Sequence, residues 1–234
     1  MNIDNENSSL NQKIVYDLTK FTHLDFPEHL ACIVWFVGCN MRCDYCYNKS
    51  IVFSKIGKMS LNDVLFFLQK RVGLLDGVVL SGGEATEHNL ISFCKEVKKL
   101  GFFIKLDTNG TNFKEIKALI KLNLLDFISL DFKAPKYKFS KITHSNKFDS
   151  FSKTLDFLIS QNFNFEVRTT LHRDLLNEED INLMINYLKN RGYFKNYFLQ
   201  SFLETEDNIG GLKASTIKFD KSKLSKALEV IWRN

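Results

Sequence analysis

The sequence lacks the long apolar runs that would place it in a membrane. A charged residue interrupts every long apolar stretch, so none reaches the ~18 residues of a membrane-spanning helix. The first segment, Met1 to Gln12, is polar and has neither the basic start nor the apolar block of a signal peptide. Lysines are spread along the chain rather than gathered in one block, so the net charge of +5 does not indicate nucleic-acid binding. These absences predict a cytoplasmic protein with no membrane or nucleic-acid partner.

Long linkers, low-complexity blocks and repeats of fixed length are absent as well. The 234 residues fall within the size range of one large domain, and 44% hydrophobic residues are enough to bury a sizeable core. We therefore expect a flexible N-terminal segment over residues 1–12 and a single domain over residues 13–234.

Cysteines are few, but their placement is informative. There are five, an odd number, and nothing indicates secretion, so a disulfide framework is not expected. Cys39, Cys43 and Cys46 lie within eight residues with the spacing C-x3-C-x2-C, which asks for a chemical cause. Cys32 and Cys94 stand apart in apolar segments and are expected to be small core residues.

Three thiolates on one short loop can hold iron or zinc, because each is a soft ligand. A [4Fe–4S] cluster normally takes four cysteines; with three, one iron stays open, as in metal sites that bind a substrate. The alternative is a zinc site completed by a distant histidine, although no histidine has zinc-finger spacing. The candidate histidines are His23, His29, His88, His144 and His172.

Six short apolar runs, rich in β-branched and aromatic residues, are predicted to be strands. They lack polar alternation, which is typical of parallel strands covered by helices on both faces. The predicted strands are Leu30–Phe36, Gly77–Leu80, Phe102–Leu106, Phe127–Leu130, Phe165–Thr170 and Tyr193–Leu199.

Six segments with apolar residues at helical spacing lie between and after these strands. Ser60 and Asn177 are predicted to cap the first and the fifth, because each precedes an apolar stripe and is followed by acidic residues. The alternation predicts an α/β fold, either an open doubly wound sheet or a partial barrel, whose function gathers at the carboxyl ends of the strands. The helical segments are Leu61–Leu68, Leu90–Val97, Lys114–Leu122, Phe148–Ser160, Ile181–Leu188 and Leu224–Ile231.

Two glycines and a glutamate follow the second predicted strand. Gly82 and Gly83 carry no Cβ atoms, so backbone groups can approach a ligand closely there. Glu84 adds a charged acceptor suited to an ammonium group. Taken alone, the pair of glycines first indicates a turn. Its place after a buried strand makes a binding site an equal alternative.

Charged residues occupy the ends of the next strands. Asp107, Thr108 and Asn109 follow the third strand, and Asp131 and Lys133 the fourth. Two aspartates at neighbouring strand ends could bind a ribose hydroxyl or a cation, and a lysine could pair with a carboxylate; caps and turns are the alternative.

A further charged residue, Arg168, lies inside the apolar fifth strand. A buried guanidinium needs a partner, and an anionic ligand is one candidate.

The cysteine loop carries a resemblance to a known family. Gly38 to Asn48 closely resembles the radical S-adenosylmethionine signature C-x3-C-x-Φ-C, with Tyr45 as the aromatic Φ, and Ser81–Thr86 is similar to that superfamily's GGE motif. The superfamily fold, a partial (β/α)6 TIM-like barrel of parallel strands with outer helices, agrees with the six βα units. Within it, the chain is most similar to the activating proteins of anaerobic ribonucleoside-triphosphate reductase, from about Phe21 to Phe202.

The resemblance implies a role for each matching residue. Cys39, Cys43 and Cys46 would ligate three irons of a [4Fe–4S] cluster, whose open iron would chelate the amino and carboxylate groups of S-adenosylmethionine. Asp107 and Asp131 match positions near a monovalent cation in the related pyruvate formate-lyase activators. The implied cofactor-binding residues are Tyr45, Gly82, Gly83, Glu84, Asp107, Thr108, Asn109, Asp131, Lys133 and Arg168.

The resemblance also implies a reaction. A reduced cluster would split S-adenosylmethionine into methionine and a 5′-deoxyadenosyl radical, which would take a hydrogen atom from a glycine of a partner, here anaerobic ribonucleotide reductase. No second cysteine set follows Cys46, so a flavodoxin- or ferredoxin-type donor would supply the electron. Val37, Tyr47 and Ala85 replace the Gln, His and Pro common in these activators, and such residues beside the cluster bear on the choice of partner.

Other functions remain open at this point. A radical enzyme acting on a small molecule, such as 7-carboxy-7-deazaguanine synthase, would share the cluster and cofactor but leave no radical on a protein. A non-catalytic iron–sulfur electron carrier or redox sensor would have no affinity for S-adenosylmethionine. A structural zinc protein would be distinguished by metal analysis.

Overall fold

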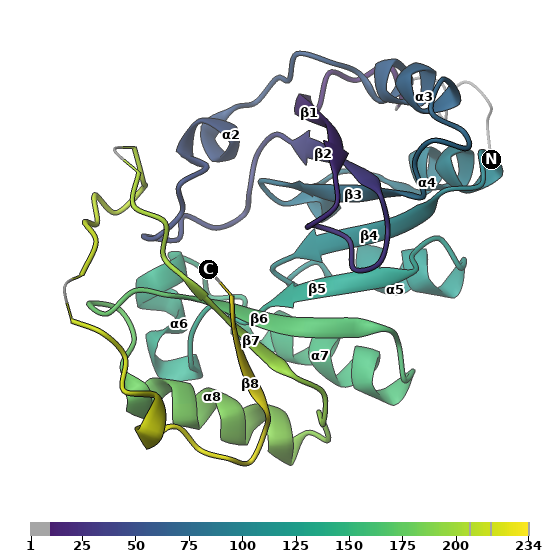
Figure 1. Cartoon of the computed structure of the whole chain (residues 1–234). Helices are drawn as coiled ribbons and strands as arrows, with labels where there is room; N and C mark the ends of the chain where they lie inside the picture. The colour runs from purple at the N-terminus through teal and green to yellow at the C-terminus, as the bar shows by residue number, and fades with distance from the viewer. Residues whose placement is uncertain (1–9, 206, 216, 234) are drawn as a thin grey trace. The chain divides into compact units, whose positions relative to one another are not determined.

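The computed structural model describes residues 10–205, 207–215 and 217–233 (Figure 1). The predicted α/β fold is confirmed, with mostly parallel strands separated by helices. The strands are β1 (Val15–Thr22), β2 (Ala31–Phe36), β3 (Gly77–Gly82), β4 (Phe103–Thr108), β5 (Phe127–Asp131), β6 (Phe165–Leu171), β7 (Tyr197–Ser201) and β8 (Val230–Arg233). The helices are α2 (Lys49–Phe53), α3 (Leu61–Gln69), α4 (Ile91–Lys99), α5 (Phe113–Lys121), α6 (Lys136–Thr143), α7 (Phe148–Ser160) and α8 (Glu178–Asn190), with short 3₁₀ helices at Ala85–Glu87 and Lys221–Lys223.

The chain forms two compact units, each built from several segments. The first unit comprises Met1–Asn40, Ser50–Thr108 and Asn112–Ile128. The second comprises Met41–Lys49, Asn109–Thr111 and Ser129–Asn234. The cysteine loop therefore contributes to both, with Cys39 in the first unit and Cys43 and Cys46 in the second.

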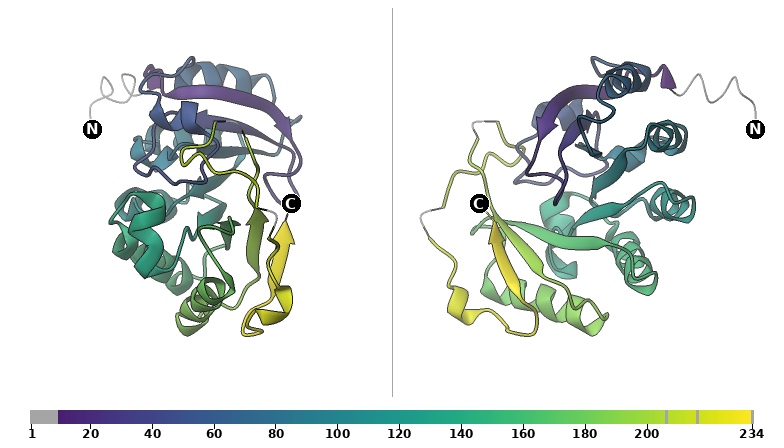
Figure 2. Two further views of the ribbon diagram at one scale, coloured as in Figure 1. Left: turned by 90° about the vertical axis from the view of Figure 1, so that its left-hand side faces the viewer. Right: turned by 45° about the vertical axis from the view of Figure 1, so that its right-hand side comes forward.

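In the first unit, β2, β3 and β4 pair in parallel in chain order, and β1 adds antiparallel to β2. Helices α3, α4 and α5 lie along one face of these strands (Figure 2). Ser60 caps α3 as predicted: its hydroxyl accepts from the Asp63 N–H (3.2 Å), and the Asp63 carboxylate accepts from the Ser60 N–H (2.7 Å). On the strands, Ile33 and Val79 belong to a buried apolar cluster that also includes Phe26 and Ala31.

In the second unit, β6, β7 and β8 pair in parallel. One face of β6 and β7 packs against α8. On this face the Tyr197 hydroxyl of β7 contacts the Met184 sulfur of α8 and also forms a hydrogen bond with the Thr169 hydroxyl of β6. The predicted Asn177 cap of α8 is confirmed, with its side chain accepting from the Asp180 N–H at 2.9 Å. On β6, Glu166 and Arg168 point to the other face because side chains alternate along a strand.

The sixth predicted helix, Leu224–Ile231, is wrong. Its end forms β8 instead, where Ile231 pairs with Phe198 of β7. Val230, Ile231 and Trp232 have high strand propensity, and hydrogen bonding to the open edge of β7 outweighs a helical spacing of apolar residues. The last predicted strand also begins late, at Tyr197, because Tyr193 lies in the irregular segment before the strand, where its hydroxyl donates to the Asn196 carbonyl (2.8 Å).

Several elements were not predicted, namely β1, α2, α6 and β8. Of the N-terminal segment expected to be flexible, residues 1–9 lie outside the described residues; Leu10 is buried and Asn11 accepts a hydrogen bond from Asn62 (2.6 Å). Within the described ranges, no helix is long and apolar enough to cross a membrane. The single domain over 13–234 stays a prediction.

Candidate functional site

Cys39 follows β2 on a loop whose backbone is held on two sides. The Gly38 N–H donates to the Ile51 carbonyl (2.9 Å), and the Gly38 carbonyl accepts from the Glu84 N–H (2.8 Å). Gly38 itself has φ +76°, a left-handed conformation that favours glycine. The Cys39 side chain is partly exposed.

The two glycines at the end of β3 are required by the close approach of β2. A Cβ at Gly83 would lie 1.8 Å from the Gly38 carbonyl oxygen, and one at Gly82 would lie 2.4 Å from the Phe36 nitrogen. Gly82 also has φ +108°. The sequence left a turn and the close approach of a ligand as equal explanations of these glycines, and the resemblance implied a ligand role. The structure accounts for them by backbone packing, which brings the end of β3 against the cysteine loop, and their ligand role stays a prediction.

Glu84 is buried at the end of β3 with hydroxyl donors around it. Its carboxylate accepts from the hydroxyls of Thr86 (2.6 Å) and Thr108 (2.7 Å), and from the Thr86 N–H (3.3 Å). The side chain is 1% exposed. Two of the predicted cofactor-binding residues, Glu84 and Thr108, are thus in direct contact within the first unit.

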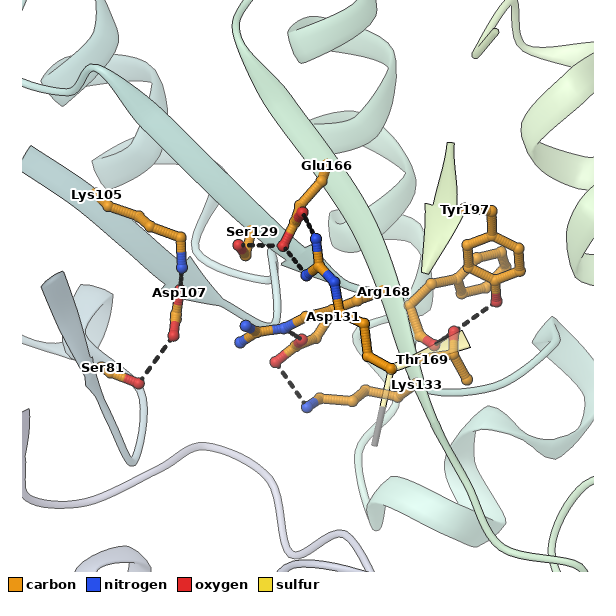
Figure 3. Close-up of polar contacts among 12 residues, drawn as sticks. Ser81, Lys105, Asp107, Ser129, Asp131, Lys133, Glu166, Arg168, Thr169 and Tyr197 are labelled. Atoms are coloured by element: carbon orange, nitrogen blue, oxygen red, sulfur yellow. Dashed lines mark hydrogen bonds and ion pairs between the residues drawn. The ribbon is translucent and has the colours of Figure 1, made fainter. Parts of the chain in front are cut away.

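Asp107, at the end of β4, forms a buried ion pair that sequence reasoning missed. Its carboxylate accepts from the Lys105 ammonium and from the Ser81 hydroxyl (3.1 Å; Figure 3). Lys105 is 2% exposed, and a lysine inside an apolar strand was the signal that could have predicted the pair. The Lys105 ammonium supplies positive charge where a cation was expected.

In the second unit, the cysteine loop runs along the end of α6. The Arg42 and Asp44 N–H groups donate to the carbonyls of Thr143 (2.9 Å) and Ile142 (3.0 Å). These carbonyls belong to the last turn of the helix, where they have no partner within it, so the loop satisfies them. His144, which ends the helix in a left-handed conformation, places its Nε2 2.7 Å from an Asp44 carboxylate oxygen.

Cys43 is buried and Cys46 is partly exposed on this loop. Burial raises the pKa of the Cys43 thiol to about 11, against the opposing effect of the Lys133 charge. The free thiol is therefore protonated at neutral pH, and metal binding there has to release its proton.

The Tyr45 side chain is buried with its hydroxyl unsatisfied. No oxygen or nitrogen partner for this hydroxyl exists among the residues that the structure describes, and the nearby Cys43 thiol is the group it can interact with. Burial raises the pKa of Tyr45, so the hydroxyl keeps its proton. The Lys133 ammonium lies 5.8 Å from the centre of the Tyr45 ring. A buried polar group without a partner indicates a place where a bound molecule completes the site.

Asp131, at the end of β5, joins two of the other predicted residues (Figure 3). Its carboxylate accepts from the Arg168 Nε (2.5 Å) and from the Lys133 ammonium (2.9 Å). Burial would raise the pKa of Asp131, but the two cations hold it at about 2. Burial would lower the pKa of Lys133, but the nearby Asp131 carboxylate raises it above its ordinary value. Asp131 is thus a partner of the kind that Arg168 was expected to need.

A second ionic group lies on the same face of β5 and β6 as this trio. Glu166 accepts from Arg233 of β8 through both carboxylate oxygens (2.9 and 2.8 Å) and from the Ser129 hydroxyl (2.8 Å; Figure 3). Its charges are balanced, and it ties the C-terminal strand to β6.

Asn109 lies in a turn. Its side-chain oxygen accepts from the Thr111 N–H (3.0 Å) and hydroxyl (2.7 Å), and Gly110 has φ +73°. The turn reading of this segment is confirmed, and its cofactor role stays a prediction.

The remaining cysteines and the histidines bear on the zinc alternative. Cys32 in β2 and Cys94 in α4 are buried core residues, as predicted. Four candidate histidines are engaged in contacts with other protein atoms, which weakens the zinc reading. These contacts join His29 to the Pro27 carbonyl (2.6 Å), His88 to the Val37 carbonyl (2.8 Å), His144 to Asp44 (2.7 Å) and His172 to the Lys213 carbonyl (2.8 Å).

The parallel α/β fold and the cysteine triplet after β2 define the class of protein. The family model of the Radical SAM superfamily matches residues 33–188, well over half of the chain. The chain therefore belongs to this superfamily, as its resemblance predicted. Membership implies a [4Fe–4S] cluster and S-adenosylmethionine. The donors present fit these groups, because three soft thiols share one loop and Tyr45 leaves a buried hydroxyl unsatisfied beside them.

Known proteins place the chain further within the superfamily. A Methanocaldococcus jannaschii protein provisionally named as a glycyl-radical enzyme activating enzyme is 31% identical over 179 residues, covering 72% of each chain. The pyruvate formate-lyase-activating enzyme of Clostridium pasteurianum is 28% identical over 173 residues, covering 68% of this chain and 69% of that one. These matches establish a distant homology to glycyl-radical enzyme activating enzymes.

A solved structure supports the fold. Streptococcus suis SuiB, crystallised with S-adenosylmethionine, superposes with a TM-score of 0.65 at 12% identity over 86% of this chain. This chain covers 52% of that protein, about half its length, so the likeness concerns the fold alone. It confirms the partial-barrel α/β fold predicted from the resemblance.

Proposed function

We propose that this radical SAM protein is an activating enzyme that generates a glycyl radical on a partner enzyme. Cys39, Cys43 and Cys46 would hold the [4Fe–4S] cluster, which supplies reductive cleavage of S-adenosylmethionine. The observation that carries the proposal is the intact C-x3-C-x-Φ-C triplet in a chain homologous to glycyl-radical enzyme activating enzymes.

In this proposal the second unit binds an anionic or ribose part of the cofactor. Lys133 and Arg168 both contact the carboxylate of Asp131 at the end of β5, so two cationic side chains lie close together there. Guanidinium and ammonium groups are donors suited to an anionic group. The Tyr45 hydroxyl provides a further polar atom on the same side of the unit.

The first unit would receive the ammonium group of the cofactor at Glu84. Its carboxylate is fixed by the hydroxyls of Thr86 and Thr108, so it needs no reorganisation on binding. We leave the monovalent cation out of the proposal. Asp107 already has Lys105 as a counter-charge, and Asp131 has Arg168 and Lys133.

The finer part of the proposal is the partner, anaerobic ribonucleoside-triphosphate reductase. It is supported by the resemblance of the stretches 74–84, 105–111, 129–135 and 166–170 to activators of that enzyme. A flavodoxin- or ferredoxin-type protein would deliver the electron, since the chain offers one cysteine triplet after β2.

The first test is anaerobic reconstitution with iron and sulfide, reduction with dithionite, and measurement of 5′-deoxyadenosine after addition of S-adenosylmethionine. Cys43→Ala should abolish the product. Cys94→Ala is the matched control, since Cys94 is buried in α4 and should be dispensable for the reaction. Product formation by Cys43→Ala would contradict the ligand assignment.

The second test identifies the substrate. Purified anaerobic reductase incubated with the active protein should show the electron paramagnetic resonance doublet of a glycyl radical. Formation of 5′-deoxyadenosine without any protein radical across a panel of glycyl-radical enzymes would favour a small-molecule substrate. Absence of S-adenosylmethionine binding by protein carrying four irons would favour an electron carrier or sensor.

A further inference from the structure

The chain after β7 is described over residues 202–205 and 207–213, and the first and the last of these residues both contact His172. Phe202, at its start, packs edge-on against the His172 ring with ring centres 4.8 Å apart. The Lys213 carbonyl, at its end, accepts from His172 Nε2 (2.8 Å), while the Asp174 N–H donates to the other ring nitrogen. His172 is 2% exposed, so the base of the loop is anchored in a buried position.

The tip of this loop is closed by Asn208. Its side-chain oxygen accepts from the Leu212 N–H (2.7 Å), and its side-chain nitrogen donates to the carbonyls of Leu212 (2.7 Å) and Thr205 (3.1 Å). Asn208 is 5% exposed although it sits in a loop. The tip is therefore a defined structure rather than a free connection.

This tip contacts the cysteine loop through backbone hydrogen bonds. The Ile209 N–H donates to the Cys46 carbonyl (3.0 Å), and the Gly210 N–H donates to the Asp44 carbonyl (2.7 Å). A salt bridge of 2.7 Å between Lys49 and Asp207 adds to the contact. The described part of the loop after β7 thus contacts the cysteine loop at two residues, Asp44 and Cys46.

Gly210 has no room for a side chain at this contact. An added Cβ would lie 2.7 Å from the Asp44 Cβ and 2.8 Å from the Asp44 carbonyl oxygen. The neighbouring Gly211 differs, because nothing lies within 4 Å of its added Cβ and its φ of +64° alone accounts for glycine there. The requirement for glycine at 210 is therefore set by the cysteine loop.

The cysteine loop is consequently held from both sides within the second unit. Its N–H groups at Arg42 and Asp44 donate to α6, and its carbonyls at Asp44 and Cys46 accept from the loop after β7. We propose that the stretches 202–205 and 207–213 act as a strap that holds Cys43 and Cys46 in their metal-binding geometry and slows loss of the cluster. Gly210 and Ile209 are its positioning residues. This inference rests on the ligand role proposed above for the cysteines.

Gly210→Ala tests the strap, with Gly211→Asn as the matched control because asparagine tolerates a left-handed backbone. In the iron-free protein, hydrogen exchange of the peptides covering 42–46 and 207–211 should accelerate in Gly210→Ala only. In the reconstituted protein, iron release to a ferrous chelator should become about tenfold faster, equivalent to ~1.4 kcal/mol. The thermal midpoint of the iron-free protein should change little, since the strap lies outside the strands and helices.

Ile209→Pro provides a second variant, because proline removes the N–H that donates to the Cys46 carbonyl. It should also accelerate iron release and alter the electron paramagnetic resonance spectrum of the reduced cluster. Faster exchange with unchanged iron release in both variants would overturn the strap, as would unchanged exchange. Iron retention by Cys43→Ala would instead overturn the ligand assignment, so the two failures are distinguishable.

Discussion

The ion pairs of Asp131 allow a prediction of stability and of its dependence on pH. Asp131→Asn removes the carboxylate shared by Arg168 and Lys133 and keeps the shape of the side chain. Lowering the pKa of Asp131 from 3.8 to about 2 corresponds to ~2.5 kcal/mol of stabilisation at neutral pH. The variant also removes the carboxylate that two largely buried cations contact, which raises the expected loss to between about 2.5 and 5 kcal/mol.

The pH dependence follows from the direction of this pKa change. A lowered carboxyl pKa stabilises the fold above pH 3.8, and this stabilisation is lost as the pH falls through about 2, where the carboxyl is protonated in both states. The difference in unfolding free energy between the two proteins should therefore be constant from pH 7 to pH 5. Of the contribution that arises from the pKa, about half should remain at pH 3.

Urea denaturation of the iron-free protein at these three pH values measures the difference. Asp149→Asn is the matched control, since Asp149 pairs with Lys136 at 3.0 Å but both side chains are exposed, so little change is expected. A loss at pH 7 below ~0.5 kcal/mol for Asp131→Asn would refute the reasoning, because that value is typical of an exposed pair. A loss that stays the same at pH 3 would refute the assignment of the effect to the carboxylate charge.

Three further predictions concern single side chains. Tyr45→Phe should leave the thermal midpoint of the iron-free protein unchanged or slightly raised, because the hydroxyl has no oxygen or nitrogen partner among the described residues; a clear drop in a melting curve would show that one exists. Asp180→Ala should cost about 3 to 5 kcal/mol in urea titration, because it removes the buried acceptor of a lysine and a tyrosine of α6, whereas the exposed Glu179→Ala should cost little. Gly83→Ala should abolish iron retention in a reconstitution assay, since its Cβ would lie 1.8 Å from the Gly38 carbonyl and must move the cysteine loop; normal iron content would contradict this.

The patterns along the chain were reliable where local chemistry decides the structure. The buried strands β2 to β6 are short segments rich in apolar and β-branched residues, and the caps of α3 and α8 have their acidic partners within the first turn, so both could be predicted from neighbouring residues. Helix α7 has the predicted bounds, Phe148–Ser160. Strand β1 was missed because most of its residues are exposed or half-buried and polar residues interrupt its apolar ones, so it has no continuous apolar run.

Among the site residues, residue types were predictable and partners were not. A charged residue within an apolar strand signals a buried ion pair, which held for Arg168 and would have held for Lys105. Neither sequence position reveals its partner, because Asp131 lies 37 residues before Arg168 and meets it through the pairing of strand ends. The wrong helix at Leu224–Ile231 has a similar cause, since the pairing of Val230 and Ile231 with the edge of β7 is not evident from the sequence.

The amino-acid sequence by itself determined the cysteine triplet, the motifs after the strands and hence membership of the radical SAM superfamily, because these depend on residue types at short spacing. Only the tertiary structure decided which charges neutralise one another and why Gly83 and Gly210 carry no side chain. It also decided that a loop more than 150 residues further along the chain supports Asp44 and Cys46. These features arise from close approaches between segments that are distant in the sequence, and local sequence patterns do not indicate which distant segments come into contact.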